Sequence, residues 1–191
     1  MRKVVFDIET KNEFKDVGSA DPSKLDLSIV GVYDSSTDTY FAYTEEELGS
    51  LWPVMENADM LIGFNSDHFD IPLLNKYYPG NLARIKSIDL LDEIKKSLGR
   101  RIKLDTIAEA TLGVRKSGHG LQAISWWKNG EIEKVKKYCL DDVRITKELY
   151  DYARKHGELK YSERGEIKPI KIDSNGWEET GSNTMTHTLP F

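Results

Sequence analysis

The order of short apolar runs and longer helical patterns is the feature that most restricts how this chain can fold. The run from Arg2 to Ile8 is short, apolar and rich in β-branched residues, which predicts a buried strand. The longest helical pattern extends from Glu131 to His156 and stops at Gly157, a residue type that ends helices well. Because strands come early and helices late, with some alternation between them, we expect an α/β fold with a mixed central sheet flanked by helices.

The other elements are predicted from the same local signals. Further strands are expected over 27–33, 39–43, 60–64 and 87–90, and further helices over 44–57, 71–78, 91–98, 105–112 and 121–128. Thr44 and Glu47 have the spacing of a capping box, which marks the start of the first of these helices. Residues 11–26 are polar and contain Gly18 and Pro22, so they are expected to form a loop.

A change in character after residue 156 predicts two parts of unequal size. Residues 1–156 are expected to form one domain, and residues 157–191 a C-terminal extension. Within the extension, 158–162 and 166–172 are expected to pair as a hairpin. The polar chain from Asp173 onward is expected to be loosely held and flexible.

Charge and cysteine content exclude several classes of protein. The net charge of −5, from 27 basic and 32 acidic residues, argues against a general nucleic-acid coat protein but not against an enzyme that acts on nucleic acid. The single Cys139 excludes an internal disulfide framework and a cysteine-based zinc site. No apolar run approaches the roughly 18 residues of a membrane span, and no signal-peptide core follows the start, so we expect a cytoplasmic protein with no membrane partner.

Asp7 and Glu9 occupy alternate positions at the end of the first predicted strand. Side chains alternate across a strand, so these two carboxylates point the same way and repel each other unless a cation lies between them. By itself the pattern is weak, because an Asp-x-Glu string is expected about once by chance in a chain of this composition.

Two further segments carry acids in unusual settings. Asn65 and Asp70 lie in a string between a short apolar run and a predicted helix, where open α/β sheets hold ligands. Tyr138 and Asp142 are four residues apart in the longest predicted helix, so they share one face. Asp142 lies on or beside the apolar stripe of that helix, whereas Asp141 is expected to face water.

As a set, the three strings in this order are rarer than any one of them. Asp7, Glu9, Asp70 and Asp142 are therefore expected to converge at one edge of the sheet. Carboxylate oxygens suit Mg²⁺ or Mn²⁺ rather than zinc. Two such ions would form the two-metal arrangement that cleaves phosphodiester bonds.

Together these segments resemble the three motifs of the DEDD 3′–5′ exonucleases, which have a ribonuclease H-like fold. Tyr138, four residues before the last acid, points to the tyrosine branch (DEDDy), since the histidine branch would need His at the position of Lys137. Residues 63–72 and 117–121 are most similar to the exonuclease domain of family B DNA polymerases and its free-standing bacterial and archaeal relatives. The resemblance covers about residues 1–155.

The resemblance implies a role for each acid and for the tyrosine. Asp7 would bridge both metal ions, and Glu9 and Asp142 would complete the site of the ion that activates water. Asp70 would serve the second ion, partly through water, and Tyr138 would orient the attacking water.

The resemblance also implies an activity and partners. The activity would be metal-dependent 3′–5′ exonuclease cleavage of terminal phosphodiester bonds, with single-stranded DNA as the expected substrate. Thr10 would touch the terminal nucleotide, and Asn65 would help to place the substrate or Asp70. A polymerase or DNA-repair protein is an expected partner, because the rest of the chain is too short for a polymerase domain.

Two alternatives stay open at this point. One is a different enzyme on the same fold, either a ribonuclease or a structure-selective endonuclease. The other is a non-catalytic module that binds nucleic acid or recruits a polymerase. The complete set of acids argues against the second alternative, since a decayed enzyme is expected to have lost at least one of them.

Several secondary features have two interpretations each. The basic runs 100–103 and 115–116 could contact phosphate or form solvated faces, with neither reading favoured. Trp126 and Trp127 could stack on bases, but at helical spacing one of them is expected to belong to the core. His68 is expected to have a structural or solvent role rather than to bind metal.

Overall fold

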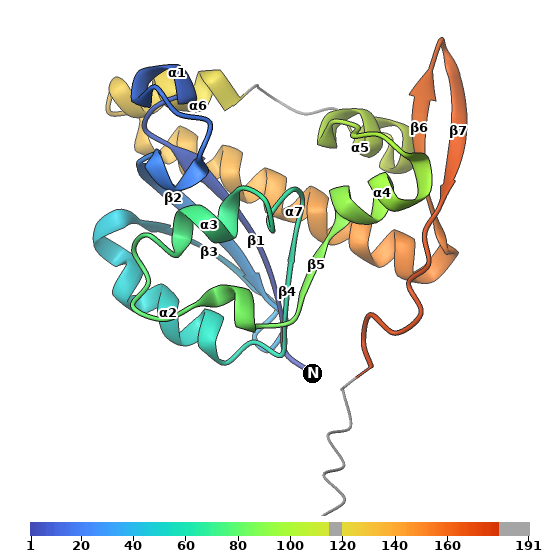
Figure 1. The fold of residues 1–191 in the computed structure, drawn as a ribbon, viewed down its shortest axis with the longest axis horizontal. Coiled ribbons are helices and arrows are strands. Elements are labelled where there is room, and N and C mark those ends of the chain that lie inside the picture. Colours follow the sequence, from blue (N-terminus) through green and yellow to red (C-terminus); the bar gives the residue numbers. More distant parts are fainter. Residues whose placement is uncertain (115–119, 180–191) are drawn as a thin grey trace, which may run out of the picture.

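Five strands form one mixed sheet in the computed structural model, which describes residues 1–114 and 120–179 (Figure 1). The order across the sheet is β3-β2-β1-β4-β5, with β1 at the centre. The strands are β1 (Lys3–Thr10), β2 (Leu27–Asp34), β3 (Thr39–Thr44), β4 (Met60–Gly63) and β5 (Ser87–Asp89). Strands β1, β2 and β3 pair antiparallel, whereas β1, β4 and β5 pair parallel. The predicted α/β class and mixed sheet are confirmed.

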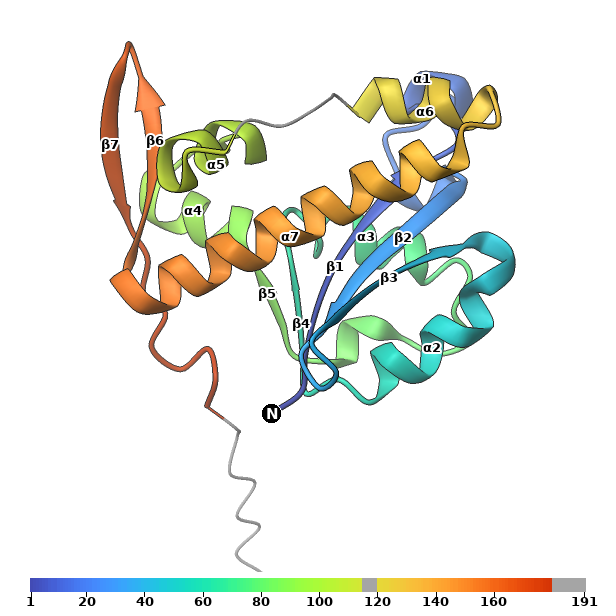
Figure 2. The ribbon, with the colours of Figure 1, turned by 180° about the vertical axis from the view of Figure 1, so that it is seen from behind.

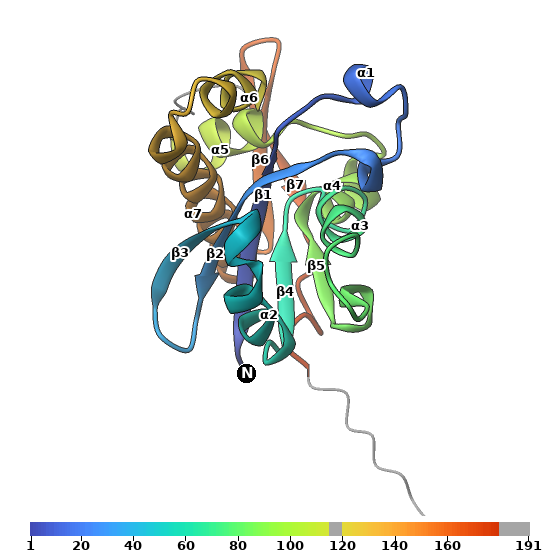
Figure 3. The same ribbon diagram turned by 90° about the vertical axis from the view of Figure 1, so that its left-hand side faces the viewer.

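Alternate side chains of β1 enter two different cores. Val4, Phe6 and Ile8 pack with residues of α2 (Leu48–Glu56) and α3 (Asp70–Leu74) on one face of the sheet. Val5 packs on the other face with residues of α7 (Ile132–His156). Figure 3 shows α7 on one side of the strands and α3 on the other. By the same alternation, Asp7 and Glu9 lie on the face that α7 covers.

Helix α7 crosses the back of the sheet along its 25 residues (Figure 2). It buries one stripe of side chains against the strands and ends at Gly157, whose φ of +67° is the left-handed conformation that glycine adopts readily. The face of α7 that points away from the sheet is charged. Among the helices of the described residues, none has the length and apolar character needed to cross a membrane.

The remaining helices follow the predicted ranges closely, with two exceptions. They are α4 (Leu90–Leu98), α5 (Leu104–Leu112) and α6 (Gly120–Lys128). The predicted loop contains a short helix, α1 (Phe14–Val17), which is too short for a periodic pattern to reveal. Helix α3 ends at Leu74 instead of residue 78, and the chain continues in turns in which the N–H groups of Lys76 and Tyr77 donate to the backbone oxygens of Leu73 and Leu74. The capping box at Thr44 and Glu47 is present, although the turn that it opens is a 3₁₀ helix preceding α2.

Two C-terminal strands form a hairpin that packs on α5. Strands β6 (Glu158–Glu163) and β7 (Glu166–Lys171) pair antiparallel in ranges close to those expected. Leu159 and Ile170 are buried in the same core cluster as residues of α5 and α7. Thr111 of α5 accepts a hydrogen bond from the Lys160 N–H at 2.8 Å. The hairpin therefore shares the core of the sheet domain.

The segment after the hairpin is packed, contrary to the expectation of a loosely held chain from Asp173 onward. Trp177 is buried and stacks on Tyr150 of α7 with ring centroids 5.3 Å apart. Glu178 forms ion pairs with Lys3 and Arg154. One large aromatic residue is enough to anchor an otherwise polar segment, which composition did not reveal. Residues 180–191 lie outside the described residues.

Replacing Trp177 with alanine is expected to lower the free energy of unfolding by about 3–5 kcal/mol, because the stacked ring leaves a cavity against Tyr150. Urea unfolding followed by circular dichroism measures the change. Ile167→Ala is the control: this β7 side chain is 63% exposed, and its loss is expected to change stability by less than about 0.5 kcal/mol. Equal stability of Trp177→Ala and wild type would show that the C-terminal segment does not support the core.

Candidate active site

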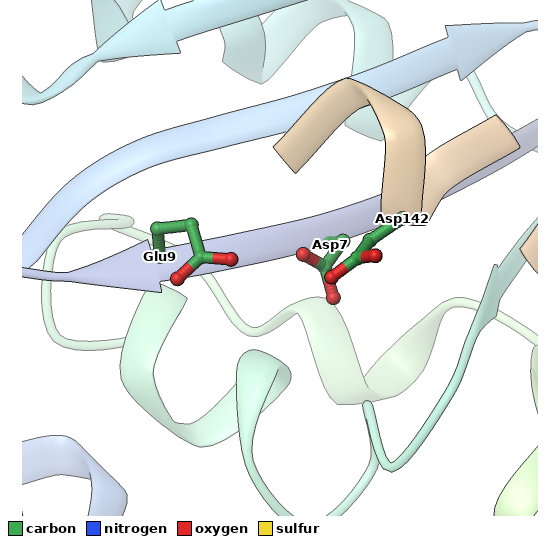
Figure 4. Close-up of side chains that lie close together, drawn as sticks. All are labelled: Asp7, Glu9 and Asp142. Atoms are coloured by element: carbon green, nitrogen blue, oxygen red, sulfur yellow. The ribbon is translucent and has the colours of Figure 1, made fainter. Parts of the chain in front are cut away.

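Three carboxylates from two distant parts of the chain meet on the α7 face of the sheet (Figure 4). Asp7 and Glu9 come from β1, and Asp142 comes from the middle of α7. One carboxylate oxygen from each lies within 4.8 Å of the others. Glu9 and Asp142 are buried, and Asp7 is half-buried. Carboxylate oxygens at such spacing are suited to a hard divalent cation, so this donor set fits Mg²⁺ or Mn²⁺.

Asp7 is also contacted by Cys139, one turn before Asp142 on α7. The Cys139 thiol donates to the backbone oxygen of Asp7 at 3.3 Å and lies 3.7 Å from Asp7 Oδ2. Burial, followed by the charges of the neighbouring acids, raises the pKa of the Cys139 thiol well above its ordinary value. The sulfur is therefore protonated and acts as a donor toward Asp7.

Asp70 approaches the same strand from the other direction. Its Oδ1 accepts a hydrogen bond from the backbone N–H of Ile8, between Asp7 and Glu9, at 3.1 Å. That N–H is available because β4 pairs with β1 only as far as Val5. Burial, and then the charges of Asp7 and Asp89, raise the pKa of the Asp70 carboxyl well above its ordinary value. Three of the predicted acids thus form one group, with the fourth beside it.

The turn that presents Asp70 is held by a residue that the sequence analysis missed. Asp89, at the end of β5, accepts hydrogen bonds from the backbone N–H groups of Asn65 at 2.7 Å and Asp67 at 3.1 Å. It also caps α4 by accepting from the N–H of Leu91 at 2.9 Å. Burial is the main reason that the pKa of Asp89 is raised. The available signal was an aspartate at the end of a predicted strand, shortly before a predicted helix, since aspartate is a preferred helix cap.

The start of this turn has backbone conformations that restrict its sequence. A Cβ on Gly63 would lie 2.3 Å from the Cβ of Ser66, so only glycine fits there. Asn65 has a φ of +68°, a left-handed conformation that asparagine adopts more readily than most residues. Its side-chain oxygen accepts a hydrogen bond from Arg101. Asn65 therefore joins the motif turn to the basic segment 100–103.

A groove of about 370 Å³ opens beside Asp7. Asn65, Arg101 and Lys103 contribute polar groups to its lining, and side chains such as Phe64 contribute apolar surface. The groove is thus lined by one carboxylate and by two cationic side chains. This places part of the basic run 100–103 at the candidate site, whereas Arg115 and Lys116 lie outside the described residues.

Tyr138 and Thr10 are close in sequence to two of the three acids, Asp142 and Glu9. The structure shows what their side chains contact. Tyr138 is 3% exposed, and its ring meets Trp126 of α6 edge-on at 6.0 Å. The Thr10 hydroxyl donates to the backbone oxygen of Asn12 at 2.8 Å. Trp126 and Trp127 are both partly buried, and Lys11 lies over the Trp127 ring at 5.3 Å. Trp126 therefore packs on the core side, as expected for one of the pair.

Other residues singled out from the sequence lie at the surface. His68 is exposed, in agreement with a solvent role. Arg100 pairs with Glu163 of the hairpin at 2.5 Å. Asp141 is not part of the group of three acids, and its carboxylate lies 3.7 Å from Arg144. Most of the string 117–121 is outside the described residues.

Comparison with known proteins agrees with this fold. A family model described as the RNase H superfamily matches residues 4–154. No curated protein matches the chain. Among solved structures, a family B DNA polymerase from the hyperthermophilic archaeon Pyrobaculum calidifontis aligns with a TM-score of 0.62 and 20% identity. The alignment covers 81% of this chain and 24% of the polymerase, so the chain spans about a quarter of that protein's length.

Asp70→Asn is expected to stabilise the metal-free protein at neutral pH and to have little effect near pH 4.5. A raised pKa means that the folded state holds a proton on Asp70 more tightly than the unfolded state. Stability is therefore lost as the pH rises from about 4 through the raised pKa, and asparagine avoids that loss. We expect a melting temperature higher by roughly 2–4 °C at pH 7.5, or about 1 kcal/mol.

Thermal unfolding in EDTA at the two pH values measures this effect. Asp141→Asn is the control, because this carboxylate is partly exposed and pairs with Arg144. A difference between Asp70→Asn and wild type that is the same at both pH values would contradict the assignment.

Proposed function

The chain belongs to the RNase H superfamily, and from that premise we propose that it is a metal-dependent 3′–5′ exonuclease. The substrate in this proposal is the 3′ end of a nucleic acid, with single-stranded DNA as the first choice. The observation that carries the proposal is the meeting of Asp7, Glu9 and Asp142 in one group. Three neighbouring acids from two elements repel one another, which destabilises the fold unless a cation offsets the repulsion.

In this proposal Asp7, Glu9 and Asp142 hold divalent ions, with Asp70 as the additional acid. When bound, Mg²⁺ or Mn²⁺ lowers the pKa of its water and stabilises negative charge on the phosphate, and two ions would stabilise both the attacking and the leaving oxygen. Tyr138 lies one helical turn before Asp142 and is held by Trp126. We assign to its hydroxyl the orientation of the attacking water.

The groove beside Asp7 has the charge distribution that a nucleotide end requires. Arg101 and Lys103 supply positive charge for phosphate oxygens, and Asp7 lines the same groove. Apolar lining such as Phe64 provides surface for a base or a sugar. Asn65, fixed by Asp89 through its backbone and by Arg101 through its side chain, orients the terminal nucleotide in this proposal. Thr10 is proposed to contact the same nucleotide.

A separate polymerase or repair protein is the proposed partner. The alignment covers 24% of the polymerase that this chain resembles in fold. In a proofreading role, this domain would act together with a polymerase.

A time course on 5′-labelled single-stranded DNA and RNA tests the activity, with Mg²⁺, Mn²⁺ or EDTA in parallel reactions. The proposal predicts a ladder that shortens from the 3′ end only when metal is present. Substrates blocked at the 3′ end and circular substrates are the controls. Cleavage of circles would indicate an endonuclease, and exclusive digestion of RNA would indicate a ribonuclease. No cleavage with either metal would leave a binding module.

Asp7→Ala and Asp142→Asn are each expected to lower the exonuclease rate by at least about a hundredfold, because each removes a charge that holds metal. The Asp7→Ala protein is expected to be as stable as wild type or more stable, since repulsion is relieved. Asp141→Asn is the matched control on α7: this neighbouring acid is outside the group and should leave the rate unchanged. Metal-dependent digestion by Asp7→Ala at the wild-type rate would refute the site.

Tyr138→Phe is expected to lower kcat by roughly 10–100-fold while the metal concentration for half-maximal activity stays the same. The ring remains to pack on Trp126, so stability should change little. Steady-state rates at several Mn²⁺ concentrations separate the two effects. An unchanged kcat would remove Tyr138 from the mechanism.

A further inference from the structure

Strand β2 has a glycine directly opposite Asp7. In the antiparallel register of β1 and β2, Asp7 pairs with Gly31. Residues paired in this way point to the same face of a sheet, so position 31 lies on the face covered by α7. Gly31 is not among the glycines with positive φ, so backbone conformation does not explain why glycine is needed here.

The explanation is the close approach of helix α7. A Cβ on Gly31 would lie 2.9 Å from Cys139 Sγ and 3.1 Å from Val143 Cγ2. Non-bonded heavy atoms are attractive at about 3.5–4.0 Å and repel at the shorter distances. Both neighbours belong to α7 and bracket Asp142 in the sequence. Any side chain at position 31 would therefore push away the part of the helix that carries Asp142.

Cys139 makes the same contact from the helix side. It is fully buried, and its sulfur lies 3.3 Å from the backbone oxygen of Asp7. The thiol is thus enclosed between Gly31 on β2 and Asp7 on β1. A small residue on the strand meets a small residue on the helix, directly beside the carboxylates.

We propose that Gly31 and Cys139 are positioning residues that set the separation of Asp7 and Asp142, and through it the affinity for divalent metal. This inference rests on the proposed function. Asp7 and Asp142 belong to different elements, so the distance between their carboxylates follows the distance between α7 and the sheet. Metal sites tolerate ligand displacements of only about 0.2 Å, and Mg²⁺ requires near-octahedral geometry. A shift of a few tenths of an ångström at α7 is therefore enough to weaken binding.

The test compares wild type, Gly31→Ala, Cys139→Ala and the double variant. Mn²⁺ binding is measured from the free-ion EPR signal, without substrate, and folding is checked by thermal unfolding. We expect Gly31→Ala to weaken Mn²⁺ binding by roughly 10–100-fold, the range found when residues behind metal ligands are changed. Removing the sulfur makes room for the new methyl group, so the double variant should return to within about threefold of wild type.

Gly49→Ala is the matched control, because a Cβ at that position on α2 meets no atom within 4 Å. It should bind Mn²⁺ as wild type does. Wild-type binding by a folded Gly31→Ala protein would overturn the inference. So would a double variant that binds as weakly as Gly31→Ala, since the loss would then not come from the contact with Cys139.

A second variant covers the case in which Gly31→Ala does not fold. Cys139→Val adds bulk from the helix side and is expected to weaken Mn²⁺ binding by roughly tenfold. Unchanged binding by this variant would overturn the inference. This test can fail independently of the proposed function. A wild-type protein that binds Mn²⁺ but degrades no nucleic acid would refute the exonuclease. An active wild-type protein whose Gly31→Ala variant binds Mn²⁺ equally tightly would refute only the positioning role of Gly31 and Cys139.

Discussion

Repulsion between neighbouring carboxylates is the constraint around which this domain is organised. Asp7 and Glu9 share one face of β1, and Asp142 is brought to them by a helix that begins more than a hundred residues later in the sequence. Such an arrangement is unfavourable by itself, so the surrounding fold must supply the stability that the site lacks. The two apolar cores on either side of β1 do so, because the strand that carries the acids also sends buried apolar side chains into both of them.

Backbone N–H groups at irregular positions complete the site. The end of β1 extends beyond the pairing with β4, and the N–H of Ile8 that remains binds Asp70. Asp89 binds the N–H groups of the turn that leads to Asp70 and also caps α4. Backbone N–H groups that pair with no neighbouring strand thus become hydrogen-bond donors, and the buried carboxylates of Asp70 and Asp89 accept from them. This explains why Asp89 is as deeply buried as the motif acids although it belongs to none of the motifs.

Residues beyond the family match pack against the elements that line the groove. The match ends at residue 154, yet the hairpin of β6 and β7 packs on α5, and α5 begins directly after Lys103 in the groove. Arg100 pairs with Glu163 of the hairpin next to Arg101, which binds Asn65. Trp177 and Glu178 then fix the C-terminal segment to α7 and β1. The position of the segment that carries Arg101 and Lys103 therefore depends on a part of the chain that lies outside the motifs.

The sequence by itself determined the fold class, the order and approximate bounds of the main elements, and the acids that belong together, because hydrophobic periodicity, capping residues and motif spacing are local properties. It did not reveal α1, the early end of α3 or the packing of Trp177, because one short turn, the exact end of a five-residue helix and the burial of one aromatic residue leave no periodic pattern. Only the tertiary structure showed that Asp7, Glu9 and Asp142 form one group with Asp70 beside it, that Asp89 holds the turn, and that Gly31 faces Cys139. These facts depend on the distance between α7 and the sheet, and that distance is set by contacts between residues far apart in the sequence.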